Sequence, residues 1–186
     1  APSRDQEKAK EYLATALSEL GCTVDDLSAH LSIDCGDSPT SIAEASFYQE
    51  QWRQVLGIEV AVNSMITKQG SQNRKTGNYV MSITGWGPDY NDPMTDLDLM
   101  MSTNGNNHTG YADADYDALI ESTKTERDAA AREQIFVQAE MKLAEDMPVI
   151  PVYWRHEDYA ASEKLVEGYA RKPFQAYNFI YTKLAD

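Results

Sequence analysis

Apolar residues recur at helical spacing in several stretches of the chain, and residues typical of helix boundaries flank these stretches. Residues 5–20 begin with an aspartate that can cap a helix and are followed by a glycine, and residues 38–56 open with Ser-Pro and also precede a glycine. The same spacing predicts a short helix within residues 94–101 and longer helices over residues 113–124 and 128–145. The chain is therefore predicted to be rich in amphipathic helices.

Short runs with strand-like patterns lie between these helices. Residues 29–34 alternate between apolar and polar side chains, and residues 58–62 and 79–84 read as two further strands. Residues 65–77 are polar and weakly patterned, which suggests a short helix and a turn. Residues 147–154 are apolar but contain prolines, which predicts an edge strand or an irregular one. Helices and strands that alternate with short links predict an α/β layer whose strands can run parallel.

Residues 85–93, with the sequence GWGPDYNDP, follow the third predicted strand and precede the short helix. Their glycines and prolines exclude a continuous helix or a central strand, so an ordered loop is predicted. Trp86 and Asp89 would place a flat apolar surface beside a negative charge, as a ligand with a cationic head requires. The alternative is a surface turn in which Trp86 fills a gap in the core.

The composition restricts the classes of partner. The chain has 186 residues, a net charge of −14 and a pI near 4.5, which argues against binding to nucleic acids or anionic membranes. Cationic and zwitterionic partners remain possible. A chain of this length can bury a sizeable core without a metal or a disulfide. No apolar run is long enough to span a membrane, and the start lacks a signal core and a methionine, so we expect a mature or excised fragment.

The two cysteines, Cys22 and Cys35, enclose a short segment between a predicted helix end and a predicted strand end. A disulfide closing that loop would stabilise the fold by about 3 kcal/mol and would imply an oxidising compartment. Two buried free thiols are the alternative. No histidine or third cysteine stands at the spacing of a zinc site.

Motifs for catalysis or phosphate binding do not occur. His30, His108 and His156 are scattered and fit no metalloprotease, serine-hydrolase or cysteine–histidine spacing, so surface or capping roles are expected. The glycines of the 85–93 loop lead into a proline and not into a helix that could cradle a phosphate. Residues 107–109 fit the N-glycosylation triplet, which is common by chance.

Four aspartates, Asp89, Asp92, Asp96 and Asp98, lie close together in the sequence and suggest calcium. The EF-hand spacing fails, because Met94 stands where the turn glycine should be and no glutamate closes the loop. No metal and no other cofactor is therefore expected.

Several motifs together suggest a family, and they occur in the same order as in that family. They are residues 9–21, 51–60, 85–93, 106–111, 116–120, Glu140 and residues 145–151. In this combination the chain resembles, nearly from end to end, the C-terminal part of the dipeptide- and oligopeptide-binding proteins of bacterial ABC importers. These proteins are extracellular solute-binding proteins of family 5.

The resemblance implies an α/β fold in which a mixed sheet is flanked by helices. This fold would form one lobe of a two-lobe, periplasmic-binding-protein-like (type II) structure. Residues 1–165 would be the C-terminal lobe, and residues 166–186 would be a terminal segment that returns to the missing N-terminal lobe. Without that lobe, residues 177–184 should pack less well than the rest.

The resemblance also implies a function without catalysis. Such a lobe captures a peptide ligand, together with the missing N-terminal lobe, and delivers it to the membrane subunits of an ABC importer. The location would be extracytoplasmic, and the full-length parent would be lipid-anchored. Asp89 would pair with the α-ammonium of the peptide, and Trp86 would line the same pocket with Gly87 and Tyr90. Arg74 occupies a position where some members meet ligand carboxylates or side chains, although a solvated surface arginine is the alternative.

Three other functions remain open at this point. Family members that look alike bind sugars, nickel complexes or haem in place of peptides. A hydrolase could use Asp89 and Asp92 as a carboxylate pair, which requires an enclosed pocket and a raised pKa. A protein-interaction module could use an exposed apolar surface around Trp86 and Tyr90.

Overall fold

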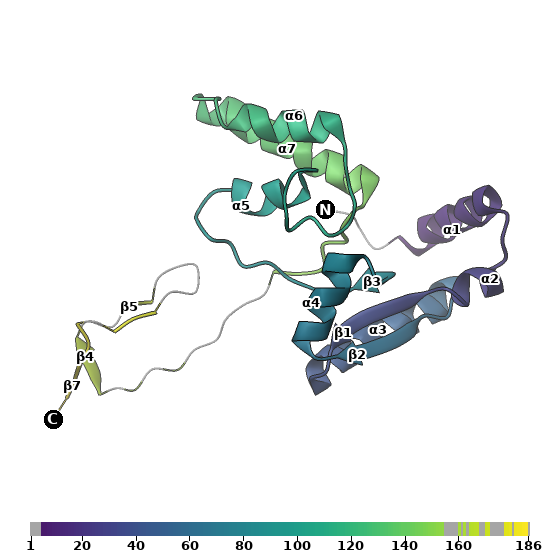
Figure 1. The fold of residues 1–186 in the computed structure, drawn as a ribbon, viewed down its shortest axis with the longest axis horizontal. Helices are drawn as coiled ribbons and strands as arrows, with labels where there is room; N and C mark the ends of the chain where they lie inside the picture. The colour runs from purple at the N-terminus through teal and green to yellow at the C-terminus, as the bar shows by residue number, and fades with distance from the viewer. Residues whose placement is uncertain are drawn as a thin grey trace. The chain divides into compact units, whose positions relative to one another are not determined.

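The structure is a computed structural model in which the chain forms two compact units, residues 1–85 and 86–186 (Figure 1). It describes residues 5–154, 160, 162, 164–167, 170–171, 177–179 and 181–185. The boundary between the units falls at the start of the 85–93 loop. No helix in these described ranges is long and apolar enough to cross a membrane.

The helices of the first unit begin and end where the sequence supplies caps. Asp5 accepts a hydrogen bond from the backbone N–H of Lys8 and starts the first helix, and Gly21 ends it in the left-handed conformation, with φ 64°. Thr23 and Asp26 form a capping box for the second helix. The helices in the described part of this unit are α1 (Gln6–Leu20), α2 (Val24–Ser28), α3 (Pro39–Leu56) and α4 (Thr67–Thr76).

A three-stranded parallel sheet forms the centre of this unit, which confirms the predicted parallel layer. Its order is β2-β1-β3, with β1 (Ser32–Gly36) between β2 (Ala61–Met65) and β3 (Met81–Ser82). The first strand begins later than predicted because the capping box starts α2 just before it. The second strand is also displaced, since residues 58–60 belong to no helix or strand and pairing begins only at residue 61.

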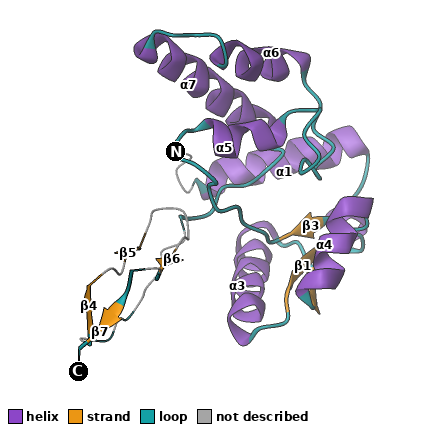
Figure 2. Cartoon of the chain, turned by 60° about the vertical axis from the view of Figure 1, so that its left-hand side comes forward, coloured by secondary structure: helices purple, strands orange, loops and turns teal. Residues whose placement is uncertain are grey.

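The two faces of the sheet differ in chemistry. Ile33 and Cys35 on β1 are buried against α3, in a core that includes Ala45. Side chains alternate along a strand, so Asp34 faces the other side of the sheet, where it contacts Asn73 on α4. Figure 2 shows β1 lying between α3 and α4. The first unit thus has an apolar layer on one face of its sheet and a polar contact on the other.

The described helices of the second unit follow the predicted pattern closely. They are α5 (Met94–Leu97), the 3-10 turn η1 (Asp98–Met100), α6 (Ala114–Thr123) and α7 (Ala129–Asp146). α6 and α7 lie side by side in both ribbon views. Tyr116 on α6 is fully buried, and its hydroxyl donates to the carbonyl oxygen of Leu97 at 2.5 Å. This hydrogen bond joins α5 to the α6–α7 pair.

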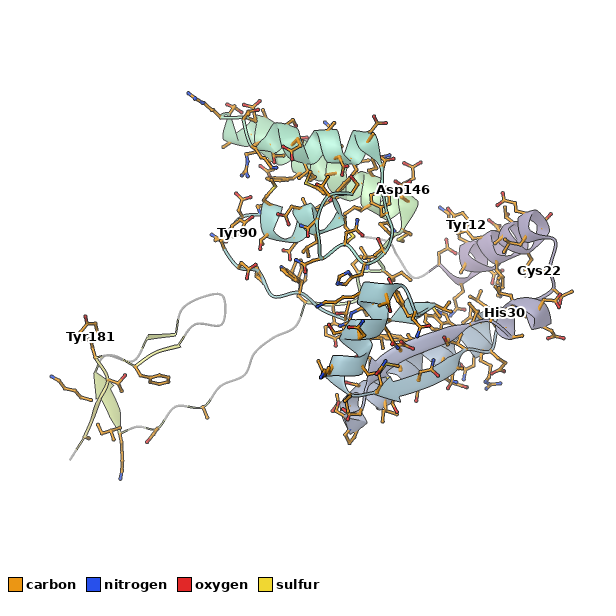
Figure 3. The ribbon with its side chains drawn as sticks, viewed as in Figure 1. Tyr12, Cys22, His30, Tyr90, Asp146 and Tyr181 are labelled. Atoms are coloured by element: carbon orange, nitrogen blue, oxygen red, sulfur yellow. The ribbon has the colours of Figure 1, made fainter. Side chains whose placement is uncertain are left out.

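The C-terminal part contains short antiparallel pairs, β4 (Leu165–Glu167) with β7 (Lys183–Leu184) and β5 (Ala170–Arg171) with β6 (Tyr177–Asn178). The run at residues 147–154 forms no strand, since its prolines cannot donate to a ladder. Phe179, Tyr181 and Leu184 are 58%, 76% and 67% exposed, and Tyr181 is labelled in Figure 3. Side chains elsewhere, such as Trp154 at 81%, are equally exposed, so the weaker packing of residues 177–184 stays a prediction. The domain boundary at residues 165 and 166 stays a prediction.

Candidate functional site

Asp92 anchors the predicted binding loop, at the point where it enters α5. Its side-chain Oδ1 accepts from the backbone N–H of Met94 at 3.0 Å, and its own N–H donates to the carbonyl oxygen of Tyr90 at 3.0 Å. Its carboxylate also binds the guanidinium of Arg132 on α7, at 2.6 Å and 2.9 Å. Both side chains are mostly buried, with 27% of Asp92 and 28% of Arg132 exposed.

Arg132 makes two more contacts that fix its position. Its Nε donates to the carbonyl oxygen of Thr123 at 2.9 Å, and its guanidinium lies 4.6 Å from the centre of the Phe136 ring. Hydrogen bonding from Arg132 lowers the pKa of Asp92, so that this carboxylate stays ionised at neutral pH. A catalytic acid needs the opposite shift. The hypothesis of a hydrolase that pairs Asp89 with Asp92 therefore loses its support.

Asp89 differs from Asp92 in that only its backbone is engaged. Its N–H donates to the hydroxyl of the buried Thr95 at 3.0 Å, which fixes the backbone at this position. The side chain is exposed, and within the described residues its carboxylate has neither a hydrogen-bond donor nor an ion-pair partner. The loop thus exposes the carboxylate of Asp89 to solvent, whereas the carboxylate of Asp92 is bound by Arg132.

Two aromatic side chains flank this carboxylate in the sequence, and both are accessible. Trp86 is 45% exposed and Tyr90 is 46% exposed, so Trp86 does not fill a gap in the core, as the alternative required. Figure 3 shows Tyr90 on the loop that leads to α5. Burial and the nearby carboxylates of Asp98, Asp92 and Asp89 raise the pKa of Tyr90, which keeps its phenol protonated. Gly87, between the aromatic residues, is exposed.

The other members of the acidic cluster have different surroundings. Burial raises the pKa of Asp96 and of Asp98. The nearby carboxylate of Asp98 raises the pKa of Asp96 further. Within the described residues, no three His, Cys, Asp or Glu side chains are placed to hold a metal ion. His30 is exposed and His108 is half-buried, whereas His156 lies outside the described residues.

Arg74 belongs to the first unit, where it lies on α4. Its side chain is half-buried, and Nη1 donates to the hydroxyl of Ser82 on β3 at 3.3 Å. This half-buried position does not decide between a ligand contact and the solvated surface arginine that was the alternative. Its role toward a ligand stays a prediction.

The disulfide favoured from the sequence is not formed in the structure, where Cys22 and Cys35 are free thiols. Cys35 is 3% exposed and packs in the core beneath α3, whereas Cys22 is half-buried in the turn after α1 (Figure 3). Burial raises the pKa of Cys35, which disfavours the reactive thiolate. The alternative of free thiols describes the structure better, although only one of the two is fully buried.

Asn107, in the glycosylation triplet, has a structural role that the triplet did not reveal. Its amide nitrogen donates to the carbonyl oxygens of Met100 at 3.2 Å, Met101 at 3.1 Å and Tyr111 at 2.8 Å. Its Oδ1 accepts from the backbone N–H and the hydroxyl of Thr109. A side chain with all these contacts holds the loop between η1 and α6 and is not presented for modification.

Sequence reasoning missed Arg132 and Thr95, which position the loop. Thr95 stands only a few residues from Asp89, but its hydroxyl contact depends on the loop conformation. Arg132 is 40 residues from Asp92, and no local pattern links two residues at that separation. The one signal in the sequence is that Arg132 stands one helical turn before Phe136, an apolar residue that is expected to be buried.

Comparison with known proteins identifies the family. Residues 1–108, more than half of the chain, match the middle region of the bacterial extracellular solute-binding proteins, family 5. The oligopeptide-binding protein OppA of Bacillus subtilis (strain 168) is 34% identical over 169 residues, which cover 87% of this chain and 30% of that protein. The chain therefore spans less than a third of the length of this relative.

Solved structures agree with the predicted fold class. Listeria monocytogenes OppA bound to peptide is 26% identical with a TM-score of 0.78, over 98% of this chain and 34% of that one. The substrate-binding domain of an oligopeptide ABC transporter from Bacillus anthracis str. Ames is 24% identical with a TM-score of 0.86, over 100% of this chain and 36% of that one. The fold is thus an α/β part of the type II periplasmic-binding structure. The chain belongs to family 5 of the bacterial extracellular solute-binding proteins.

Proposed function

We propose that this chain is the ligand-capturing lobe of an extracytoplasmic solute-binding protein that delivers peptides to an ABC importer. Asp89 receives the α-ammonium of the peptide, and Trp86, Gly87 and Tyr90 form the adjoining wall. The lobe does no chemistry on its ligand. The longer parent protein supplies a second lobe, a membrane anchor and the contact with the importer subunits.

The observation that carries this proposal is the difference between two carboxylates of one loop. Asp92 is held by Arg132, whereas the carboxylate of Asp89 is exposed and, in the described part of the chain, has no partner. Its backbone is nevertheless fixed by the buried hydroxyl of Thr95. A solvent-exposed carboxylate on an anchored backbone can accept a ligand cation without reorganisation of the loop.

The energetics of this contact require a second lobe. A hydrogen bond between a carboxylate and an ammonium contributes about 1.5–3 kcal/mol when water is excluded, and much less on an open surface. One lobe leaves half of the ligand in water, so closure of two lobes is needed for tight binding. We therefore expect the isolated chain to bind peptides weakly, with the ammonium still required. Micromolar affinity of this chain for a peptide, measured by calorimetry, would contradict the proposal that the chain contains only half of the binding site.

A titration followed by ¹H–¹⁵N NMR tests the proposal. Tri-alanine is expected to shift the indole N–H signal of Trp86, and N-acetyl-tri-alanine, which lacks the ammonium, is expected to shift it far less. Trp52 and Trp154 provide internal references, because the chain has three tryptophans. If both peptides shift the Trp86 signal equally, or if neither does, the ammonium role is wrong.

A further inference from the structure

A second polar site lies in the first unit, on the face of the sheet that α4 covers. A cavity of about 430 Å³ opens there between β1, β2 and the segment that joins α4 to β3. Its volume falls within the range of about 300–1,000 Å³ that is typical of small-molecule sites. The residues of the 85–93 loop do not line it.

Asp34 supplies the charge of this cavity and is only 4% exposed. One carboxylate oxygen accepts from the side-chain amide of Asn63 on β2 at 3.2 Å. The other accepts from the side-chain amide of Asn73 on α4, also at 3.2 Å. Gln69 donates to the Oδ1 of Asn73 at 2.8 Å and so orients that amide toward Asp34.

Among the described residues, no cationic side chain forms an ion pair with Asp34. Arg74 follows Asn73 on the same helix, but its guanidinium donates to Ser82. A buried carboxylate is costly unless it is paired, and two neutral donors at 3.2 Å compensate its charge only in part. An ionised carboxylate has about four acceptor positions, so Asp34 retains capacity on its cavity side.

The rest of the wall indicates which cation fits. Ser32 adds a hydroxyl on the same face of β1, while Met65, Tyr79 and Val80 add apolar surface. A divalent metal ion requires several charged ligands, and no cluster of three such side chains occurs among the described residues. One carboxylate beside the amides of Asn63, Asn73 and Asn78, with a smaller apolar surface next to them, suits an ammonium group on a short aliphatic stem.

We propose that the cavity at Asp34 is a binding site for a small organic cation, with a primary ammonium on Asp34 and its stem against Met65 and Val80. The residues that line this site do not include the loop that contains Asp89. It holds or fails independently of the proposed peptide binding.

The test uses propylammonium as the probe, with propanol and propionate as neutral and anionic ligands of the same stem. Each is titrated into the full chain at constant ionic strength, and the side-chain amide signals of Asn63 and Asn73 are followed by ¹H–¹⁵N NMR. Propylammonium is expected to shift both signals in a saturable way, whereas propanol and propionate are not. No saturable shift, or an equal shift with propanol, would overturn the proposal.

Two variants locate the charge. Asp34→Asn keeps the shape and removes the charge, and it is expected to weaken propylammonium binding by about tenfold or more. Val80 is 51% exposed, so the fold should tolerate Val80→Lys. The lysine places an ammonium of the protein itself in the cavity, which should abolish the shift of the Asn63 and Asn73 signals on adding propylammonium. Asp115→Asn is the control, because it removes one exposed negative charge on α6 that does not line the cavity, and it should bind propylammonium like the wild type. Unchanged binding in a folded Asp34→Asn protein contradicts the site, and if that variant does not fold, unchanged binding in Val80→Lys contradicts it.

Discussion

Arg132 on α7 holds the carboxylate of Asp92 through two hydrogen bonds, at 2.6 Å and 2.9 Å, although 40 residues separate them in the sequence. This pair attaches the start of α5, and with it the loop that contains Asp89, to the longest helix of the second unit. The end of the loop at α5 is therefore attached to α7 before any ligand binds. Such preorganisation reduces the entropic cost of binding.

The replacement Arg132→Lys tests this attachment. Lysine keeps the charge but cannot form the two-point contact with Asp92 or the hydrogen bond to Thr123, so we expect the free energy of unfolding to fall by about 1–2 kcal/mol. Urea denaturation followed by circular dichroism measures the change. Arg127 is exposed, and Arg127→Lys should leave the stability unchanged. Equal losses in both variants would show that the Asp92 contact is not the cause.

The pH dependence of the same pair follows from the lowered pKa of Asp92. A group whose pKa is lower in the folded state contributes stability above its unfolded value of 3.8 and loses that contribution as the pH falls through the folded value. The stability difference between the wild type and Arg132→Lys should therefore be full at neutral pH and shrink below pH 3.8. A difference that stays constant down to pH 2, which is about two units lower, would contradict the ion pair.

Local patterns were sufficient to predict most helices and the parallel sheet. Asp5, Gly21 and Gly57 act within one turn of the chain, and each marks a helix boundary that the structure confirms. The displaced strands show the limit of this reasoning. Ile58 and Val60 are buried, as their apolar character suggests, but the register with β1 decides that pairing starts at residue 61.

The candidate site was only partly predictable, for the same reason. Trp86, Asp89 and Tyr90 stand in one loop whose glycines and prolines are visible in the sequence, and the structure confirms that they are exposed. Sequence analysis assigned the ligand contact to Asp89 from the family resemblance, but it predicted no partner for Asp92. Only the fold shows that the guanidinium of Arg132 binds the carboxylate of Asp92, because that contact joins elements far apart in the chain.

Asn107 should be more important for stability than its neighbour. In Asn107→Asp, a carboxylate replaces the amide that donates to three carbonyl oxygens, and the free energy of unfolding should fall by about 2–4 kcal/mol. Asn106 is exposed, and among the described residues only its backbone N–H forms a hydrogen bond, so Asn106→Asp should change the stability by less than about 0.5 kcal/mol. Thermal and urea unfolding of both proteins decide the matter, and equal effects would refute the role of Asn107.

The cysteines allow a direct chemical test. With free thiols, the denatured protein should react with two equivalents of a thiol reagent without prior reduction. In the native protein, Cys22 should react readily, whereas Cys35 is buried and has a raised pKa, so it should react only on unfolding. The variant Cys22→Ser should remove the fast phase alone. A protein whose thiols become reactive only after reduction would contain the disulfide.

The central claim is that the carboxylate of Asp89 receives the ammonium of a peptide. The most direct measurement is the ratio of affinities for tri-alanine and N-acetyl-tri-alanine, in the wild type, in Asp89→Asn and in Asp115→Asn. Asp115 is exposed on α6 and controls for the loss of one negative charge. We expect a ratio of about tenfold in the wild type and in Asp115→Asn, and a ratio near one in Asp89→Asn. A ratio that survives in Asp89→Asn would contradict the account.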